Sequence, residues 1–157
     1  MFATNAQIAL KLLKKPLKDE VEILSNFKYQ KNFTTVHSDP AVMPVKTKDW
    51  SYFNIVYDEQ KQETMNTIHF GKEKNVPVFL TNYRELSTPI AKDKIHTQFA
   101  FEQPIYNEQS LSAQGRLASI QGSHNTWFAG VFCTGHGHHE SGVESGFQVA
   151  TALSSAN

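Results

Sequence analysis

The spacing of hydrophobic residues changes twice along this chain, and each change marks a different kind of structure. Up to residue 26 the apolar positions recur every three or four residues, which is typical of amphipathic helices. Thr4 and Gln7 fit a capping box at the start of a first helix, and Pro16 separates that helix from a second. The residues expected to be buried on these helices are Ala6, Ala9, Leu10 and Leu13, then Leu17, Val21 and Leu24.

Residues 27–106 have the texture of β-strands instead. Short runs rich in β-branched and aromatic residues alternate with polar, turn-forming stretches such as Ser38-Asp39-Pro40. This alternation predicts a mixed, largely antiparallel sheet. The predicted strands are 33–37, 52–57, 66–70, 76–80 and 97–101.

From residue 107 the helical spacing returns. We expect a helix over residues 107–118 and then a strand over the apolar run 127–132. The residues expected on the buried side of this helix are Leu111, Gln114 and Leu117. The whole order predicts an α+β fold, in which helices flank the sheet and a strand, a turn and a helix end the chain.

The turn after that last strand is rich in glycine and histidine, and it opens the final helix. Ser141 and Glu144 have the spacing of a capping box, so we expect the helix to begin at Ser141. Gly135, Gly137 and Gly142 leave the main chain open to a ligand, and free N–H groups at a helix start favour an anionic or electron-rich one. The apolar stripe of this helix is expected at Phe147, Ala150 and Leu153.

Composition narrows the possible functions. The 157 residues, 39% of them hydrophobic, suffice for one domain with a packed core. Fifteen Lys and Arg balance fifteen Asp and Glu, so no net charge attracts the chain to nucleic acid or to an anionic membrane. The single cysteine, Cys133, cannot form an internal disulfide, and no apolar run approaches the ~20 residues of a membrane span. We therefore expect a cytoplasmic protein with neither a membrane span nor a nucleic-acid partner.

Two features indicate that a nucleotide-binding portion lies outside this sequence. Residues 1–4 look like the end of a strand that runs directly into a helix, as in nucleotide-binding sheets, with the rest of the strand upstream. The chain also contains neither Gly-x-Gly-x-x-Gly nor Gly-x-x-x-x-Gly-Lys-Ser/Thr, so it lacks the usual loop for a pyrophosphate. An N-terminal βαβ unit is therefore expected to be missing.

Motifs along the whole chain carry a resemblance to a known family. Gly135 to Gly142 match the C-terminal signature Gly-x-Gly-x-His-Glu-x-Gly. Further stretches follow the order of the same family, at residues 2–13, 27–32, 37–44, 50–54, 103–106, 114–122 and 127–130. The chain thus resembles the rear portion of the predicted flavin-dependent oxidoreductases of the flavin-containing amine oxidase superfamily.

The resemblance implies that this chain is the C-terminal part of such an oxidoreductase, with the N-terminal FAD-binding portion missing or on a separate chain. Residues 1–26 would return from the FAD domain, residues 27–106 would form the substrate-binding sheet, and residues 107–157 would complete the FAD domain. The complete protein would transfer hydride from an amine or another reduced small-molecule substrate to FAD. This chain alone is expected to be inactive.

By the same resemblance, the terminal turn would lie against FAD. Gly130 and Val131 would lie by the pyrophosphate and the ribityl chain. Main-chain N–H groups at residues 142 and 143 would stabilise the negative charge of the reduced ring near its pyrimidine edge. The residues running along the isoalloxazine would be His139, Glu140, Ser141, Gly142 and Val143.

Other interpretations stay open from the residues alone. Alternation along a strand would put Trp50, Tyr52 and Asn54 on one side, where they could line a substrate pocket. A non-catalytic binding or assembly module is one alternative function, and a small metal-binding protein is another, because imidazole and thiolate bind transition metals. The glycines of the turn favour flavin, so no metal is assigned. The ligands of the metal alternative would be Cys133, His136, His138, His139 and Glu140.

Overall fold

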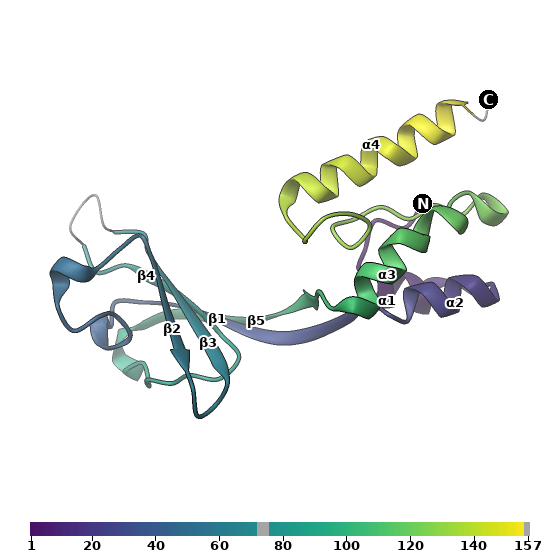
Figure 1. Ribbon diagram of the computed structural model, residues 1–157. Coiled ribbons are helices and arrows are strands. Elements are labelled where there is room, and N and C mark those ends of the chain that lie inside the picture. The colour runs from purple at the N-terminus through teal and green to yellow at the C-terminus, as the bar shows by residue number, and fades with distance from the viewer. Residues whose placement is uncertain (72–75, 156–157) are drawn as a thin grey trace. The chain divides into compact units, whose positions relative to one another are not determined.

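The chain divides into two compact units. The computed structural model describes residues 1–71 and 76–155 (Figure 1). The helical unit consists of residues 1–30 and 104–157, and the sheet unit of residues 31–103. Sequence reasoning places the corresponding boundaries a few residues away, after residues 26 and 106.

Four α-helices make up most of the helical unit, as expected from the spacing of apolar residues. Two short 3₁₀ helices, η5 (Leu117–Ser119) and η6 (Ser123–Asn125), follow the third of them. None of the helices in the described residues combines the length and the apolarity needed to cross a bilayer. The four helices are α1 (Ala6–Leu12), α2 (Lys18–Leu24), α3 (Glu108–Arg116) and α4 (His139–Ser155).

The first two helices begin slightly later than predicted. Asn5, and not Thr4, caps α1, because its side-chain oxygen accepts a hydrogen bond of 2.7 Å from the N–H of Ile8. The next helix begins only after Leu17, so Pro16 lies outside it rather than in its first turn. Pro16 therefore interrupts the helical backbone between α1 and α2 and belongs to neither helix.

The buried faces of α2 and α3 differ from the predicted stripes. In α2, Val21 is exposed, whereas Ile23 and Leu24 are buried. In α3, Leu111 is exposed, and the small residues Ser110 and Ala113 face the core. Small residues let a helix approach its neighbours closely, while large residues of other segments fill the space between them.

The last helix also turns a different face inward from the one predicted. It begins at His139, so Ser141 lies inside the first turn and does not cap it. The expected stripe of Phe147, Ala150 and Leu153 is exposed, with Phe147 at 70%. The residues buried instead are Ser141, Ser145 and Val149.

The core of the helical unit is built from aromatic side chains of distant segments. Phe27 meets Phe132 edge to face, with ring centroids 5.0 Å apart, and Phe2 stacks on Phe128 at 5.9 Å. These pairs join the segment 128–132 to the N-terminus and to the residue that precedes β1. The buried residues of the core are Ala6, Ala9, Ile23, Leu24, Phe27, Ala113, Leu117, Ile120, Phe128 and Phe132.

The strand predicted over residues 127–132 is wrong, because only one residue of it pairs. Phe2 and Phe128 form an isolated parallel bridge, in which the Phe2 N–H donates to the Trp127 carbonyl at 2.7 Å and the Ala129 N–H to the Phe2 carbonyl at 3.0 Å. The pairing ends there, since the chain enters α1 soon after Phe2 and Gly130 turns it with φ of 144°. A backbone with this φ favours glycine.

The outer edge of this bridge is closed by one side chain. The carboxamide of Gln121 accepts a hydrogen bond from the Phe128 N–H at 2.8 Å and donates one to the Phe128 carbonyl at 2.7 Å. Phe128 is fully buried, so its backbone groups would otherwise lie unpaired away from water. Gln121 thus takes the place that a neighbouring strand would occupy in a larger sheet.

Five strands form a single sheet in the order β2-β3-β4-β1-β5, which confirms the α+β class. Neighbouring strands from β2 to β1 are antiparallel. The last pair also runs in opposite directions, since the Ser38 N–H donates to the Lys94 carbonyl at one end and Asn32 bonds Gln103 at the other. The strands are β1 (Lys28–His37), β2 (Phe53–Asp58), β3 (Glu63–His69), β4 (Phe79–Tyr83) and β5 (Ile95–Ile105).

The inner face of this sheet mixes apolar and polar residues. Strand register aligns Asn54, Thr67, Thr81 and Thr35 in one buried row across four strands. Hydroxyl groups bond along this row, with Thr67 and Thr81 oxygens 2.9 Å apart. An apolar cluster packs on the same face and includes Val42, Met43, Met65, Phe79, Tyr83 and Ile90.

His37 is fully buried beside this row, and its ring is held at both nitrogens. Nδ1 accepts the N–H of Asp39 at 3.1 Å, so Nε2 carries the proton and donates to the Thr81 hydroxyl at 2.7 Å. The Asp39 carboxylate in turn accepts the N–H of Ala91 at 2.8 Å and contacts Lys94. Burial lowers the pKa of His37, since a charged ring would lose both water and its acceptor role.

Acidification is therefore expected to destabilise the sheet unit through His37. The unfolded chain binds a proton near the ordinary pKa of 6.5, whereas the folded chain does so only at lower pH. Unfolding free energy should be constant above that value and fall as pH drops from it towards the lowered pKa, by at most about 1.4 kcal/mol per pH unit. Urea unfolding at a series of pH values measures this slope.

Two variants separate His37 from the other histidines. His37→Asn retains an acceptor for the Asp39 N–H and should remove the slope, whereas replacement of the exposed His96 by Asn should leave it in place. An unchanged slope in His37→Asn would contradict this assignment.

Gln121→Ala should destabilise the helical unit by about 2 to 4 kcal/mol, because it leaves two buried backbone groups of Phe128 unpaired. Urea unfolding followed by helical circular dichroism measures this loss. Gln148→Ala is the matched control, since that exposed side chain bonds only Glu144, and it should stay within about 0.5 kcal/mol of the wild type. Equal losses in the two variants would show that Gln121 does not close the edge.

Candidate functional site

The terminal turn is fixed to the start of α4 by one serine side chain. The buried Ser145 hydroxyl accepts the N–H of Gly130 at 2.9 Å and donates to the carbonyl of Gly142 at 2.8 Å. Within the turn, the Cys133 N–H donates to the Gly130 carbonyl at 3.0 Å. The two ends of the turn are thus held together by the protein itself.

Two glycines of the turn are required by its own packing. Gly135 has φ of 62°, and a Cβ there would lie 2.5 Å from the Ser141 hydroxyl. Gly137 has φ of 80°, and a Cβ there would overlap the hydroxyl of Tyr106. Positive φ and close neighbours therefore explain both glycines without a ligand.

The start of α4 lies two residues earlier than expected, and this moves its free donors. The N–H of Ser141 already donates to the His138 carbonyl at 3.0 Å. The first four N–H groups of a helix, here those of residues 139–142, lack intrahelical acceptors, so Val143 is the first residue of α4 whose N–H enters the helical ladder. The donors left at the start of α4 are therefore those of His139, Glu140 and Gly142, whereas the N–H expected at Val143 lies beyond the first turn.

The residues expected to contact FAD do not share one environment. Gly130, Val131 and Gly142 lie together, since a Cβ at Gly142 would be 3.4 Å from the Val131 side chain. His139 and Glu140 extend into solvent, with side chains 89% and 92% exposed. The remaining two residues of the set, one buried and one exposed on α4, are Ser141 and Val143.

Tyr106, which lies just before α3, contacts the terminal turn and was not identified from the sequence. Its hydroxyl donates to the Val131 carbonyl at 3.2 Å, and its ring lies 6.2 Å from that of His136. Burial raises the pKa of Tyr106. No signal in the sequence indicates this contact, because Val131 lies 25 residues further along the chain.

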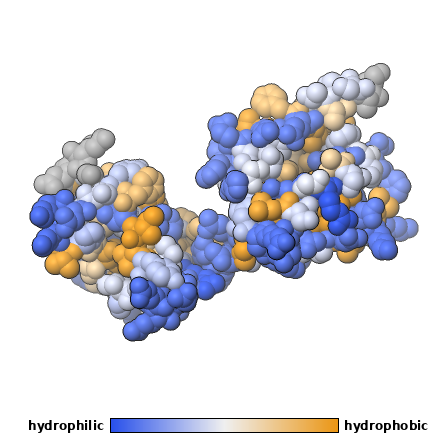
Figure 2. Space-filling view, viewed as in Figure 1, coloured by the Kyte–Doolittle hydropathy of each residue, from blue (hydrophilic) through white to orange (hydrophobic). Residues whose placement is uncertain are grey.

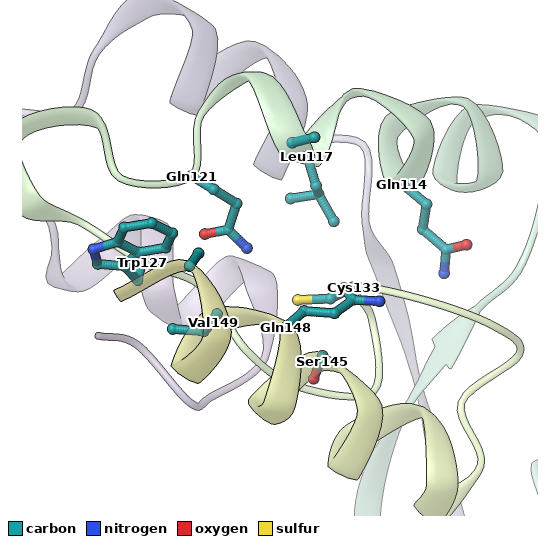
Figure 3. A pocket seen from close by; sticks show the side chains of 10 residues that line it. Gln114, Leu117, Gln121, Trp127, Cys133, Ser145, Gln148 and Val149 are labelled. Atoms are coloured by element: carbon teal, nitrogen blue, oxygen red, sulfur yellow. The ribbon is translucent and has the colours of Figure 1, made fainter. Parts of the chain in front are cut away.

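A cavity of about 270 Å³ opens between α4 and the segment formed by α3 and η5 (Figure 3). Leu117, Trp127 and Val149 supply much of its apolar wall. None of the residues expected to contact FAD lines it. The other lining residues are Gln114, Ala118, Gln121, Cys133, Ser145, Gln148 and Ala152.

Cys133 borders this cavity as an unreactive thiol. Burial raises its pKa to about 12, because a thiolate there would lie away from water. Nucleophilic catalysis needs the thiolate. This cysteine therefore acts as part of the wall.

The metal alternative finds no donor set in this arrangement. Among residues 1–71 and 76–155, no three His, Cys, Asp or Glu side chains lie close enough to share an ion. His139 and Glu140 approach each other only at 3.9 Å and are both exposed. The histidines of the turn thus do not converge.

The expected pocket residues Trp50, Tyr52 and Asn54 do not form one wall. Strand β2 begins at Phe53, so the alternation that would align the three does not apply to the first two. Trp50 packs in the sheet core and donates to the Pro44 carbonyl at 2.7 Å. Asn54 is buried on the inner face of the sheet, while Tyr52 is partly exposed.

The opposite, outer face of the sheet presents an apolar surface instead. Figure 2 shows apolar surface exposed in both units. One row across four strands consists of Phe53, Ile68, Leu80 and Val36, and the next of Ile55, Asn66, Asn82 and Thr34. Ile55 is 69% exposed. The side-chain oxygen of Asn66 is buried and has no hydrogen-bond partner among the described residues.

No protein-family model matches the chain, and no curated protein is significantly similar to it.

Alkylation of Cys133 should be slow in the folded protein. With a pKa of about 12, the thiolate at pH 8 is at least about 100-fold rarer than in the unfolded chain, where the pKa is near 8.5. Mass spectrometry of the iodoacetamide adduct, with and without urea, measures the ratio. Equal rates in both conditions would mean that the thiol is not buried as described.

Proposed function

We propose that this chain is the C-terminal part of an FAD-dependent oxidoreductase of the flavin-containing amine oxidase superfamily. The helical unit would contribute the turn and helix beside the flavin, and the sheet unit a substrate-binding surface. Bound FAD would supply the acceptor for a hydride from an amine or another reduced carbon substrate. A separate N-terminal portion would hold the nucleotide end of FAD.

The observation that carries this proposal is the outward face of α4. Val143, Phe147 and Leu153 are exposed, while the inward face is lined by serines and a valine. A surface helix of a soluble unit normally turns its apolar side inward. The reversed arrangement fits a helix that packs between the described core and a further polypeptide.

The terminal turn fits the ring end of a flavin in part. The free N–H groups of His139 and Glu140 and the positive end of the α4 dipole favour the negative charge of a reduced ring. The nearby Glu140 carboxylate is 92% exposed, so solvent screens its opposing charge. The sequence has no motif for the pyrophosphate, and the nucleotide end therefore needs another chain segment.

The outer face of the sheet is the proposed contact surface for an amine or a similar substrate. Its rows are apolar except for the carboxamides of Asn66 and Asn82 and the hydroxyl of Thr34, which donates to Asn82 at 2.6 Å. The side-chain oxygen of Asn66 is buried beneath this surface and has no hydrogen-bond partner among the described residues. A mainly apolar wall with a few amide groups suits a molecule that carries a polar group on a hydrocarbon body.

Co-expression with a polypeptide that carries the Gly-x-Gly-x-x-Gly βαβ unit tests the proposal. A reading frame directly upstream is the first candidate for this partner. The two chains should co-purify as a yellow complex with the absorbance spectrum of bound FAD. Two colourless chains that do not associate would contradict the proposal, and a colourless complex would favour the non-catalytic assembly module.

A matched pair of variants on α4 locates the contact. Phe147→Asp should abolish co-purification, because it places a charge in the apolar stripe, whereas Gln148→Asp, about 100° around the helix, should not. Both positions are exposed in the described chain, so neither change should unfold it. Association that survives Phe147→Asp would contradict the role given to this stripe.

A further inference from the structure

The cavity between α3–η5 and α4 is built as a binding site of its own. Its volume of about 270 Å³ exceeds the ~150 Å³ that suffices to hold a benzene molecule in an engineered protein cavity. A molecule with one or two fused rings therefore matches its size. Figure 3 shows the Trp127 ring at one end of the space, with Leu117 and Val149 on opposite sides.

The lining excludes charged ligands. None of the ten residues that form the cavity carries a charge at neutral pH, since the only titratable one among them, Cys133, stays protonated. A charged ligand would lose hydration without gaining an ionic partner. A neutral ligand suffers no such cost.

Two amide groups around the cavity keep an unused acceptor oxygen, and each also keeps a second N–H. Gln114 donates its N–H to the Gly135 carbonyl at 3.1 Å, and Gln148 donates to the Glu144 carboxylate at 3.2 Å. These bonds fix the orientation of both carboxamides, because a carbonyl or carboxylate oxygen can bond only their nitrogen. Their side-chain oxygens accept no hydrogen bond within the part of the chain described. The carboxamide oxygen and nitrogen of Gln121 both bond the main chain of Phe128.

We propose that this cavity binds an uncharged aromatic molecule of one or two rings that carries an N–H or O–H donor. The ring would pack against Trp127 and the aliphatic side chains of Leu117 and Val149. The donor would reach a side-chain oxygen of Gln114 or Gln148. The site is separate from the residues assigned to flavin, and it does not depend on the proposed oxidoreductase function.

Calorimetric titration of the full chain with indole tests this site. Indole should bind saturably to one site per chain. Loss of the N–H in 1-methylindole should weaken binding about fivefold, the effect of one neutral hydrogen bond. The charged indole-3-acetate should bind at least about 10-fold more weakly than indole. If the unmodified protein does not bind indole, or binds indole and indole-3-acetate with equal affinity, the proposal is overturned.

Two phenylalanine variants of α4 locate the ligand. Ala152→Phe fills the cavity and should weaken indole binding at least about 10-fold, by steric exclusion. Ala150→Phe is the matched control on the exposed side of the same helix and should leave the affinity unchanged. Circular dichroism establishes that both variants are folded. Undiminished indole binding by folded Ala152→Phe would show that the ligand lies elsewhere and overturn the assignment.

Discussion

The hydrogen bonds of Ser145 join the two segments on which the helical unit depends. They link the main chain at Gly130, just after the Phe2–Phe128 bridge, to the first turns of α4. Because this hydroxyl is buried, its loss would leave the N–H of Gly130 without an acceptor in the interior. The position of the turn, the direction of the outward stripe on α4 and one wall of the cavity all follow from this single contact.

The chain uses side chains where a larger sheet would use strands. Gln121 pairs the free edge of Phe128, and serines rather than leucines line the inner face of α4. The sheet unit likewise buries threonine hydroxyls and the His37 ring in a connected network. Such networks are stable only when each member is satisfied, so they define the fold more narrowly than apolar packing alone. Both units also leave some large apolar residues exposed, such as Phe147 on α4 and Ile55 on the sheet.

The sequence predicted the helices and strands well, but it predicted poorly which side of each helix is buried. Five strands and four helices followed from local spacing, because β-branched runs and capping residues act within a few positions. Local spacing did not predict which face of α4 is buried. Phe147 is more hydrophobic than Ser145, yet Ser145 is buried, because its hydroxyl bonds the N–H of Gly130. The run over 127–132 predicted a strand, but pairing needs a partner that the apolar pattern cannot supply. Tyr106 and the cavity were missed because both depend on segments far apart in the sequence.

Amide hydrogen exchange at Gly130, followed by NMR, tests the central contact most directly. The account predicts protection of this N–H by at least about 100-fold in the folded chain, since it donates to a buried hydroxyl. Protection should be lost in Ser145→Ala and retained in Ser154→Ala, which removes a similar hydroxyl from the exposed end of α4. Exchange of Gly130 at the rate of an unstructured amide in the unmodified protein would contradict the account.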